Sequence, residues 1–155
     1  MAEILIHARK LNSYYGASHI LRDIDFSVAA GETIGLMGRN GMGKSTLLKS
    51  IMGLVRPRGG SVQVMGRDMT GAPPYEIARL GVAYVPEGRG IFGNLSVVEN
   101  LKMAARAGQT EASRVRARAG QDWNYDRVLD TFPRLKERLR HGGQQLSGGE
   151  QQMLT

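Results

Sequence analysis

Apolar and polar residues alternate along the N-terminal part of the chain, a pattern typical of half-buried β-strands. The alternation predicts strands at residues 3–11, 23–29 and 61–65. Two short, mainly apolar runs, 33–37 and 82–85, predict strands that are buried on both faces. The run at 33–37 leads directly into a glycine-rich loop. The sequence therefore predicts that a buried strand delivers the chain to this loop.

The apolar spacing changes to that of an α-helix after the loop. A helix that begins at Lys44 carries its apolar residues on one side: Leu47, Leu48, Ile51 and Met52. Gly53 follows as a C-cap glycine would. Residues 74–80 predict a short helix, and residues 127–139 predict a longer one that Pro133 interrupts. The sequence therefore predicts an α/β core at residues 1–92 and a mostly helical sub-domain at residues 93–145.

Two stretches carry the S-x-x-E pattern of a capping box, which marks the first turn of a helix. Ser96 and Glu99 form the first box, and Ser147 and Glu150 form the second. Two glycines lie inside the second box, so side chains do not cover the N–H groups of that first turn. Such a bare helix N-terminus can dock against an anion, and an ordinary helix start is the alternative interpretation.

Composition narrows the class of protein only a little. The chain has 155 residues, no cysteine and a formal charge of +7. Disulfides and thiolate metal sites are excluded, and no apolar run approaches the roughly 20 residues of a membrane-spanning helix. Ten Lys and Arg face five Asp and Glu in 102–141, where we expect a solvated basic surface and, at 108–121, a mobile connection. The three histidines have no motif context and are expected at the solvated surface.

The glycine-rich loop fits the pattern G-x-x-x-x-G-K-[ST]. Its residues are Gly38, Arg39, Asn40, Gly41, Met42, Gly43, Lys44 and Ser45, with Thr46 adding a second hydroxyl. The glycines let successive backbone N–H groups point at phosphate oxygens, and the following helix aims its positive end at the same place. Lys44 can reach the β- and γ-phosphates, and the Ser45 hydroxyl can ligate Mg²⁺. The sequence therefore predicts a binding site for ATP and Mg²⁺.

With both motifs in view, the chain resembles the ABC ATPase family over essentially its whole length. The loop corresponds to the family's Walker A motif, and its signature motif corresponds to Leu146, Ser147, Gly148, Gly149, Glu150 and Gln151. The resemblance implies a P-loop NTPase core with an N-terminal antiparallel β sub-domain, an inserted helical sub-domain and, at 146–155, the start of the next helix. It also implies that ATP lies between two subunits, with Ser147 and Gly149 binding the γ-phosphate in trans.

Two further positions take a role from the resemblance. Tyr15 lies where the family places an aromatic ring that stacks on adenine; the alternatives are a core aromatic at a strand end, or Tyr14 as the stacking ring. Glu87 stands where the family has the Gln of its Q-loop, the hinge to the helical sub-domain. A glutamate there can ligate Mg²⁺ together with Ser45, and it adds negative charge near phosphate.

The segments around these motifs look like the branched-chain amino-acid importer branch of the family. They are residues 85–92, 95–101, 131–138 and 147–154. The implied function is to couple ATP binding and hydrolysis to amino-acid transport, and urea-type importers are the near alternative. The implied partners are a second ATP-binding subunit and transmembrane permease subunits, on the cytoplasmic face of the membrane. No nucleic-acid partner is expected, because cysteines for zinc modules and sustained heptads are absent.

The family continues into a Walker B aspartate, a catalytic glutamate and a switch histidine, and residues 1–155 do not include these motifs. We therefore expect negligible ATP hydrolysis by residues 1–155 alone, since positioning of water and metal is most of phosphoryl-transfer catalysis. A non-catalytic nucleotide-binding fragment that regulates intact subunits is the alternative function.

Overall fold

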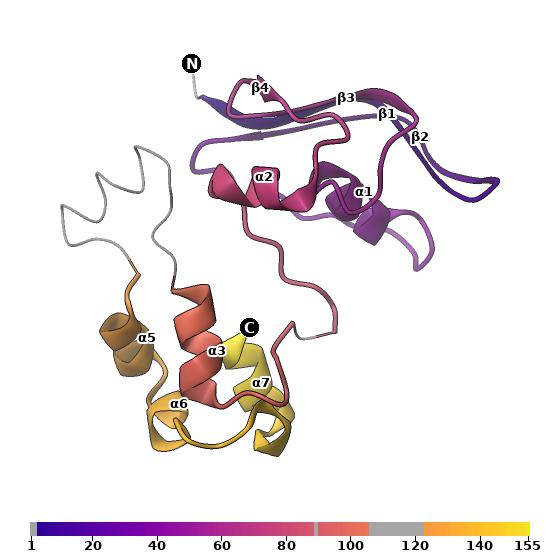
Figure 1. The fold of residues 1–155 in the computed structure, drawn as a ribbon. Coiled ribbons are helices and arrows are strands. Elements are labelled where there is room, and N and C mark those ends of the chain that lie inside the picture. The colour runs from indigo at the N-terminus through magenta and orange to yellow at the C-terminus, as the bar shows by residue number, and fades with distance from the viewer. Residues whose placement is uncertain (1–2, 89, 106–122) are drawn as a thin grey trace. The chain divides into compact units, whose positions relative to one another are not determined.

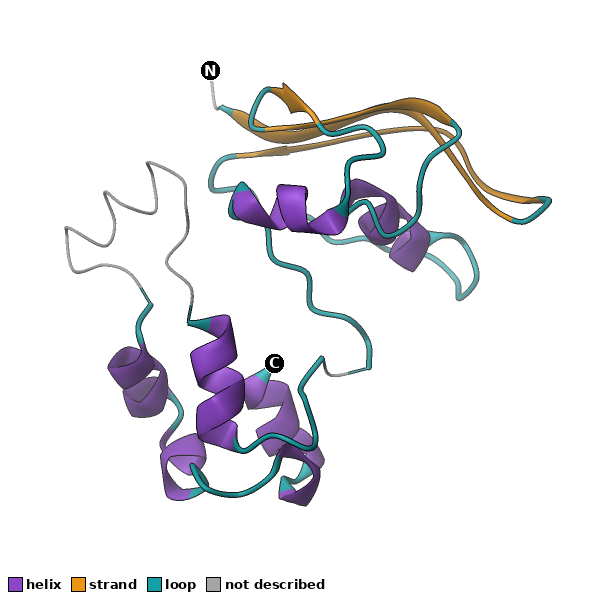
Figure 2. Cartoon of the chain, viewed as in Figure 1, coloured by secondary structure: helices purple, strands orange, loops and turns teal. Residues whose placement is uncertain are grey.

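The computed structural model describes residues 3–88, 90–105 and 123–155 (Figure 1). The chain divides into two compact units, Met1–Val82 and Ala83–Thr155, and each is treated by itself below. The first unit holds every strand of the described residues, and the second holds helices (Figure 2). The predicted mobile connection at 108–121 lies outside the described residues.

The first unit is built on a four-stranded antiparallel sheet with the order β2-β1-β3-β4. Its strands are β1 (Ile4–Tyr15), β2 (Ser18–Ala29), β3 (Gly59–Val64) and β4 (Arg67–Asp68). β1 and β2 form a hairpin with a tight turn at residues 16–17, where Gly16 has a φ of +57°. The predicted antiparallel N-terminal sub-domain is therefore present.

Both strands of the hairpin extend further toward its turn than the alternation predicts. The register shifts between Ala8 and Leu11 and again between Leu11 and Ser13, and all three residues are buried. A β-bulge of this kind inserts residues that break the period of two. The predicted strands 3–11 and 23–29 therefore miss the part of the hairpin between these shifts and the turn.

Two helices lie on one side of the sheet in the first unit (Figure 1). α1 (Lys44–Ile51) follows the glycine-rich loop, and α2 (Pro74–Arg79) begins at the predicted proline pair. Among the described residues of this unit, ten apolar residues are buried: Ala8, Leu11, Leu21, Leu47, Ile51, Met52, Val62, Val64, Ile77 and Leu80. Gly53 ends α1 with a φ of +70°, which a C-cap glycine adopts without strain.

The predicted buried strands at 33–37 and 82–85 are wrong. Neither segment pairs with a strand among the described residues, and both lack regular structure. Met37 is 93% exposed and Val85 is 55% exposed. A strand is stabilised by hydrogen bonds and side-chain contacts from its neighbours, and apolar composition alone does not supply them.

The second unit packs short helices around an apolar cluster. Its helices are α3 (Val97–Ala104), α5 (Tyr125–Thr131), α6 (Pro133–Glu137), the 3₁₀ turn η1 (Gly143–Gln145) and α7 (Gly148–Leu154). The buried cluster consists of Val97, Leu129, Leu135, Leu146 and Leu154. The predicted interruption at Pro133 is confirmed, because α5 ends at Thr131 and α6 starts at the proline. Among the described residues, no helix has the length and apolar character required to cross a membrane.

Candidate nucleotide-binding site

The glycines of the loop before α1 adopt backbone conformations that other residues avoid. Gly41 and Gly43 have φ values of +86° and +87°, in the left-handed region that favours glycine. At Gly43 a Cβ atom would also lie 3.0 Å from Cδ2 of Leu21 and 3.2 Å from Cγ2 of Ile20, both on β2. Gly43 is thus required by its conformation and by the close approach of the hairpin.

The N-terminus of α1 is left open by its own side chains. Its N-cap residue is Gly43, no side chain caps it, and its first turn contains no acidic residue. The backbone N–H groups of a first turn have no partner inside the helix, and the helix dipole makes that end positive. This end of α1 is therefore suited to an anion.

Lys44 adds a positive charge at the same place. Its ammonium donates hydrogen bonds to the carbonyl oxygens of Gly38 at 2.6 Å and Arg39 at 2.9 Å, which holds the side chain over the loop. A phosphate oxygen can replace a carbonyl as the acceptor. Ser45 is half-buried and Thr46 is buried, whereas the loop residues Arg39 to Met42 are exposed. The structure thus brings the predicted residues Gly38–Thr46 together in one site.

A buried hydroxyl pair attaches α1 to the sheet. Ser13 of β1 and Ser50 of α1 are 0% and 2% exposed, and their Oγ atoms are 2.8 Å apart. Each hydroxyl is the hydrogen-bond partner of the other, so neither is left unpaired in the core. An unpaired hydroxyl there would lower the stability of the fold. Sequence reasoning missed this pair; the only signal was a serine at an inward-facing position of each element.

The two tyrosines at the end of β1 have different surroundings. Tyr15 is 48% exposed, so it is not a core aromatic. Tyr14 is half-buried and stacks on His19 with 4.1 Å between ring centroids. Tyr14 is therefore engaged inside the chain, which favours Tyr15 as the ring available to a ligand. The expectation that the histidines lie at the solvated surface is wrong, because His7, His19 and His141 are each half-buried.

The second unit contains the predicted signature motif at the start of α7. Ser147 is the N-cap: its hydroxyl accepts from the N–H of Glu150, and the Glu150 carboxylate accepts from the N–H of Ser147 at 2.8 Å. Gly148 and Gly149 are exposed, and a Cβ at Gly149 would meet nothing within 4 Å. The predicted capping box is confirmed. Leu146, by contrast, is a core residue with 6% exposure.

Glu150 and Gln151 have defined partners in the second unit. The N–H of Ser147, by its hydrogen bond, holds the pKa of Glu150 below its ordinary value, with smaller contributions that include the charge of Arg138. Arg138 Nε lies 3.8 Å from Glu150 Oε1. Gln151 donates from Nε2 to the carbonyl of Gly143 at 2.9 Å. These contacts fix the orientation of Glu150 and Gln151, while Gly148 and Gly149 stay exposed.

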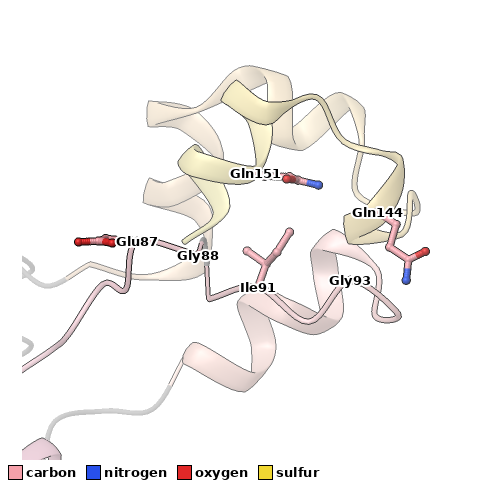
Figure 3. A pocket seen from close by; sticks show the side chains of 6 residues that line it. All are labelled: Glu87, Gly88, Ile91, Gly93, Gln144 and Gln151. Atoms are coloured by element: carbon pink, nitrogen blue, oxygen red, sulfur yellow. The ribbon is translucent and has the colours of Figure 1, made fainter. Parts of the chain in front are cut away.

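Glu87 lines a pocket of about 440 Å³ in the second unit. The other lining residues are Gly88, Ile91, Gly93, Gln144 and Gln151. Figure 3 shows Ile91 and Gln151 facing this space from the segment that follows Glu87 and from α7. The pocket therefore joins the predicted Q-loop position to the signature motif within one unit, and the role of Glu87 in metal binding stays a prediction.

Comparison with known proteins identifies the family. The profile described as "ABC transporter" matches residues 21–155. This chain belongs to the ABC transporter family. The assignments of Gly38–Ser45 to the Walker A motif and of Leu146–Gln151 to the signature motif, which rest on the resemblance described above, stay predictions.

Curated family members include branched-chain amino acid transport proteins. The chain is 41% identical over 146 residues to the high-affinity branched-chain amino acid transport ATP-binding protein BraG of Pseudomonas aeruginosa, covering 94% of this chain and 59% of that protein. It is 40% identical to the probable branched-chain amino acid transport protein LivF of Archaeoglobus fulgidus, covering 97% and 61%. A ribose import ATP-binding protein of Geobacillus kaustophilus is 35% identical, covering 92% and 30%.

The fold agrees with solved structures of the family. One described as the ATP binding subunit of an ABC transporter superposes with a TM-score of 0.77 at 34% identity, covering 97% of this chain and 59% of that one. The predicted ABC ATPase fold class is confirmed. The chain spans about three fifths of the length of the branched-chain relatives and of this structure.

A buried polar residue near the pocket also escaped sequence reasoning. Asn100 of α3 is buried, accepts from the N–H of Phe92 at 2.8 Å and donates to the carbonyls of Phe92 and Ser96, each at 3.0 Å. These bonds fix the segment that lines the pocket at Gly93. The sequence offers only a polar residue on the apolar side of a helix as a signal.

Proposed function

We propose that this chain supplies the nucleotide-binding residues of an ABC importer subunit that couples ATP binding and hydrolysis to the transport of branched-chain amino acids. The observation that carries the proposal is the open N-terminus of α1, with Lys44 held over a loop of left-handed glycines. Family membership supports the choice of ATP as the ligand. The branched-chain relatives support the substrate.

In this proposal the triphosphate binds by exchange of hydrogen-bond partners. Backbone N–H groups of 41–46 donate to phosphate oxygens, and Lys44 turns from the carbonyls of Gly38 and Arg39 to the β- and γ-phosphates. Charge-assisted hydrogen bonds of this kind are about twice as strong as neutral ones. Tyr15 stacks on the adenine ring, for which its exposure is suited.

The residues present fit Mg²⁺ that arrives with the nucleotide. Among the described residues, no group of three or more acidic or histidine side chains could hold a metal by itself. Mg²⁺ usually takes one or two protein ligands, phosphate oxygens and waters, so the Ser45 hydroxyl is a sufficient first ligand from α1. A bound ion would neutralise part of the phosphate charge.

The second half of the site comes from a partner subunit in this proposal. The exposed backbone at Gly148 and Gly149 and the Ser147 hydroxyl face the γ-phosphate of a second ATP-binding subunit. Closing the two subunits on ATP moves their helical sub-domains together. We propose that this movement drives permease subunits from the cytoplasmic face of the membrane.

The test of nucleotide binding is isothermal titration of the full-length protein with MgATP. Lys44→Ala should weaken binding by about 10- to 100-fold, because it removes charge-assisted hydrogen bonds to phosphate. Lys49→Ala, on the last turn of the same helix, is the matched control and should bind as the parent protein does. Equal affinity of the Lys44 variant and the parent protein would contradict the proposal.

The test of the substrate is uptake into proteoliposomes that contain the subunit with its permease partners. Labelled leucine, isoleucine and valine should enter in an ATP-dependent manner. Uptake of ribose or urea, with none of these amino acids, would refute the substrate while leaving the nucleotide site intact.

A further inference from the structure

The tip of the β1–β2 hairpin extends beyond the rest of the sheet. Pairing of β1 with β3 ends at Asn12 and Gly59, whereas pairing with β2 continues to Tyr15 and Ser18. Figure 1 shows β1 and β2 continuing past β3 as a two-stranded ribbon. An isolated two-stranded ribbon is marginally stable in water. Other contacts must therefore hold the strand end that carries Tyr15.

Arg58 makes three contacts to this ribbon from the residue just before β3. Its backbone N–H donates to the carbonyl of Asn12 at 2.8 Å. Its guanidinium carbon lies 4.8 Å from the centroid of the Tyr14 ring, and Nη2 donates to the carbonyl of Gly16 at 3.0 Å. The planar guanidinium of Arg58 thus contacts both sequence neighbours of Tyr15: it covers the ring of Tyr14 and donates to the carbonyl of Gly16.

His19 approaches Tyr14 from β2, the strand on the opposite side of β1 from Arg58. The two rings are directly paired across the hairpin and are nearly parallel, with an interplanar angle of 11°. His19 Nε2 is 2.8 Å from Oδ1 of Asn12, and Asn12 in turn donates to the Asp23 carboxylate at 2.9 Å. The stack is therefore tied back into the bulged part of the sheet.

We propose that Arg58, Tyr14 and His19 are positioning residues that hold the hairpin tip so that Tyr15 is presented to the nucleotide base. The inference rests on the proposed function, in which Tyr15 stacks on adenine. A stacking ring contributes its full binding free energy only when its backbone is already ordered, because ordering a mobile segment on binding opposes association. Through Tyr15, the stack of Arg58, Tyr14 and His19 affects binding of the base. It does not affect binding of the phosphates, which contact the loop before α1.

This separation of base from phosphate gives the experiment. Equilibrium binding of MgATP and of magnesium tripolyphosphate, which has no base, is measured on the full-length protein and its variants. Arg58→Ala should weaken MgATP binding about fivefold, the size of effect that one cation–π contact and one hydrogen bond at a surface produce. Tripolyphosphate binding should be unchanged. Arg22→Ala, an exposed arginine of β2, is the charge-matched control and should alter neither affinity.

A double-mutant cycle distinguishes positioning from general stability. If Arg58 acts through Tyr15, then Arg58→Ala should have no further effect on MgATP binding in a Tyr15→Ala protein. Tyr14→Phe should bind as the parent protein does, since it keeps the ring, and Tyr14→Leu should reproduce the Arg58→Ala loss. If Arg58→Ala does not fold, the two variants Tyr14→Phe and Tyr14→Leu supply the same test.

The outcomes separate this inference from the function on which it rests. Equal weakening of ATP and tripolyphosphate by Arg58→Ala, or additive effects with Tyr15→Ala, would overturn the positioning role and leave the nucleotide site standing. An Arg58→Ala protein with parent affinity for ATP, beside a weakened Tyr15→Ala protein, would do the same. A Tyr15→Ala protein with unchanged ATP affinity would overturn base stacking itself, and the positioning role with it.

Discussion

The helices α1 and α7 both carry glycine near their N-termini, yet their N-caps are built in opposite ways. α1 starts from Gly43 with no side-chain cap and no acidic residue in its first turn. α7 starts from Ser147 with a complete capping box closed by Glu150. The first turn of α1 therefore has no side-chain acceptor from a cap, whereas the first turn of α7 has two: the Ser147 hydroxyl and the Glu150 carboxylate.

The difference indicates how much α1 and α7 each contribute to nucleotide binding in the proposed site. α1 carries Lys44 and no opposing carboxylate, so it can bind phosphate by itself. α7 carries the negative charge of Glu150 in its first turn, which Arg138 offsets only in part at 3.8 Å. We therefore expect α1 to set the affinity for nucleotide, and α7 to contribute only when a second subunit brings phosphate to Gly148 and Gly149.

The largest expected effect comes from disturbing the uncapped helix. Gly43→Ala should destabilise the protein by about 1–3 kcal/mol, because alanine is strained at positive φ, and it should weaken MgATP binding more than tenfold. Gly66→Ala is the matched control: its φ is +73° and the space around it is open, in the turn between β3 and β4. The control should lose stability without losing affinity. Loss of MgATP affinity in the control as well would show that strain alone accounts for the effect.

Gly149→Ala tests the capped helix α7, and its expected effect on stability is opposite to that of Gly43→Ala. Alanine is favoured over glycine inside a helix, so stability should rise by about 0.5–1 kcal/mol, read from chemical denaturation. The added methyl group covers exposed backbone of the first turn, so transport should fall severalfold while MgATP binding by the isolated subunit stays unchanged. Gln152→Ala, further along α7, should leave transport intact. Normal transport by the Gly149→Ala protein would remove α7 from the proposed site.

The two capping boxes allow a cap to be separated from a ligand contact. Ser147→Ala and Ser96→Ala each remove an N-cap and should each cost about 1 kcal/mol of stability. Only Ser147→Ala should lower ATP-driven transport, since Ser96 starts α3 and has no role in the proposed site. Equal transport losses at equal stability losses would show that Ser147 acts only as a cap.

The smallest effect is the acid sensitivity of α7. Glu150 has a folded-state pKa below its ordinary value, so its stabilising contribution is present above the unfolded pKa of about 4.3 and is lost as pH falls through the folded pKa. Glu150→Gln keeps the acceptor of the capping box and removes the titration, so acid unfolding followed by circular dichroism should become less steep. Glu99→Gln should act in the same direction, because its pKa is lowered by Ser96. An unchanged acid profile in the double variant would contradict the assignment.

Features fixed by short-range chemistry were predictable from the sequence. The capping boxes, the start of α1 at Lys44 and the interruption at Pro133 depend on residues within a few positions of each other, and all are present. The Walker A and signature assignments rest on short contiguous patterns of the same kind and stay predictions. The bulges at Ala8–Ser13 were not predictable, because a bulge is a property of two strands and appears in one strand only as a lost alternation.

Features that depend on distant partners were missed. The segments 33–37 and 82–85 are apolar enough for strands, but no neighbouring strand pairs with them among the described residues. The Ser13–Ser50 hydroxyl pair and the contact of Arg58 with Tyr14 join residues far apart in sequence. Each of these residues is unremarkable by itself, so only the fold reveals what it contacts.

The most direct test of the contrast between α1 and α7 is amide hydrogen exchange of the full-length subunit, with and without MgATP, under conditions in which it is monomeric. The account predicts protection of residues 41–46 and unchanged exchange at 147–150. Protection at 147–150 with none at 41–46 would contradict it, because the capped helix would then be the primary binding site.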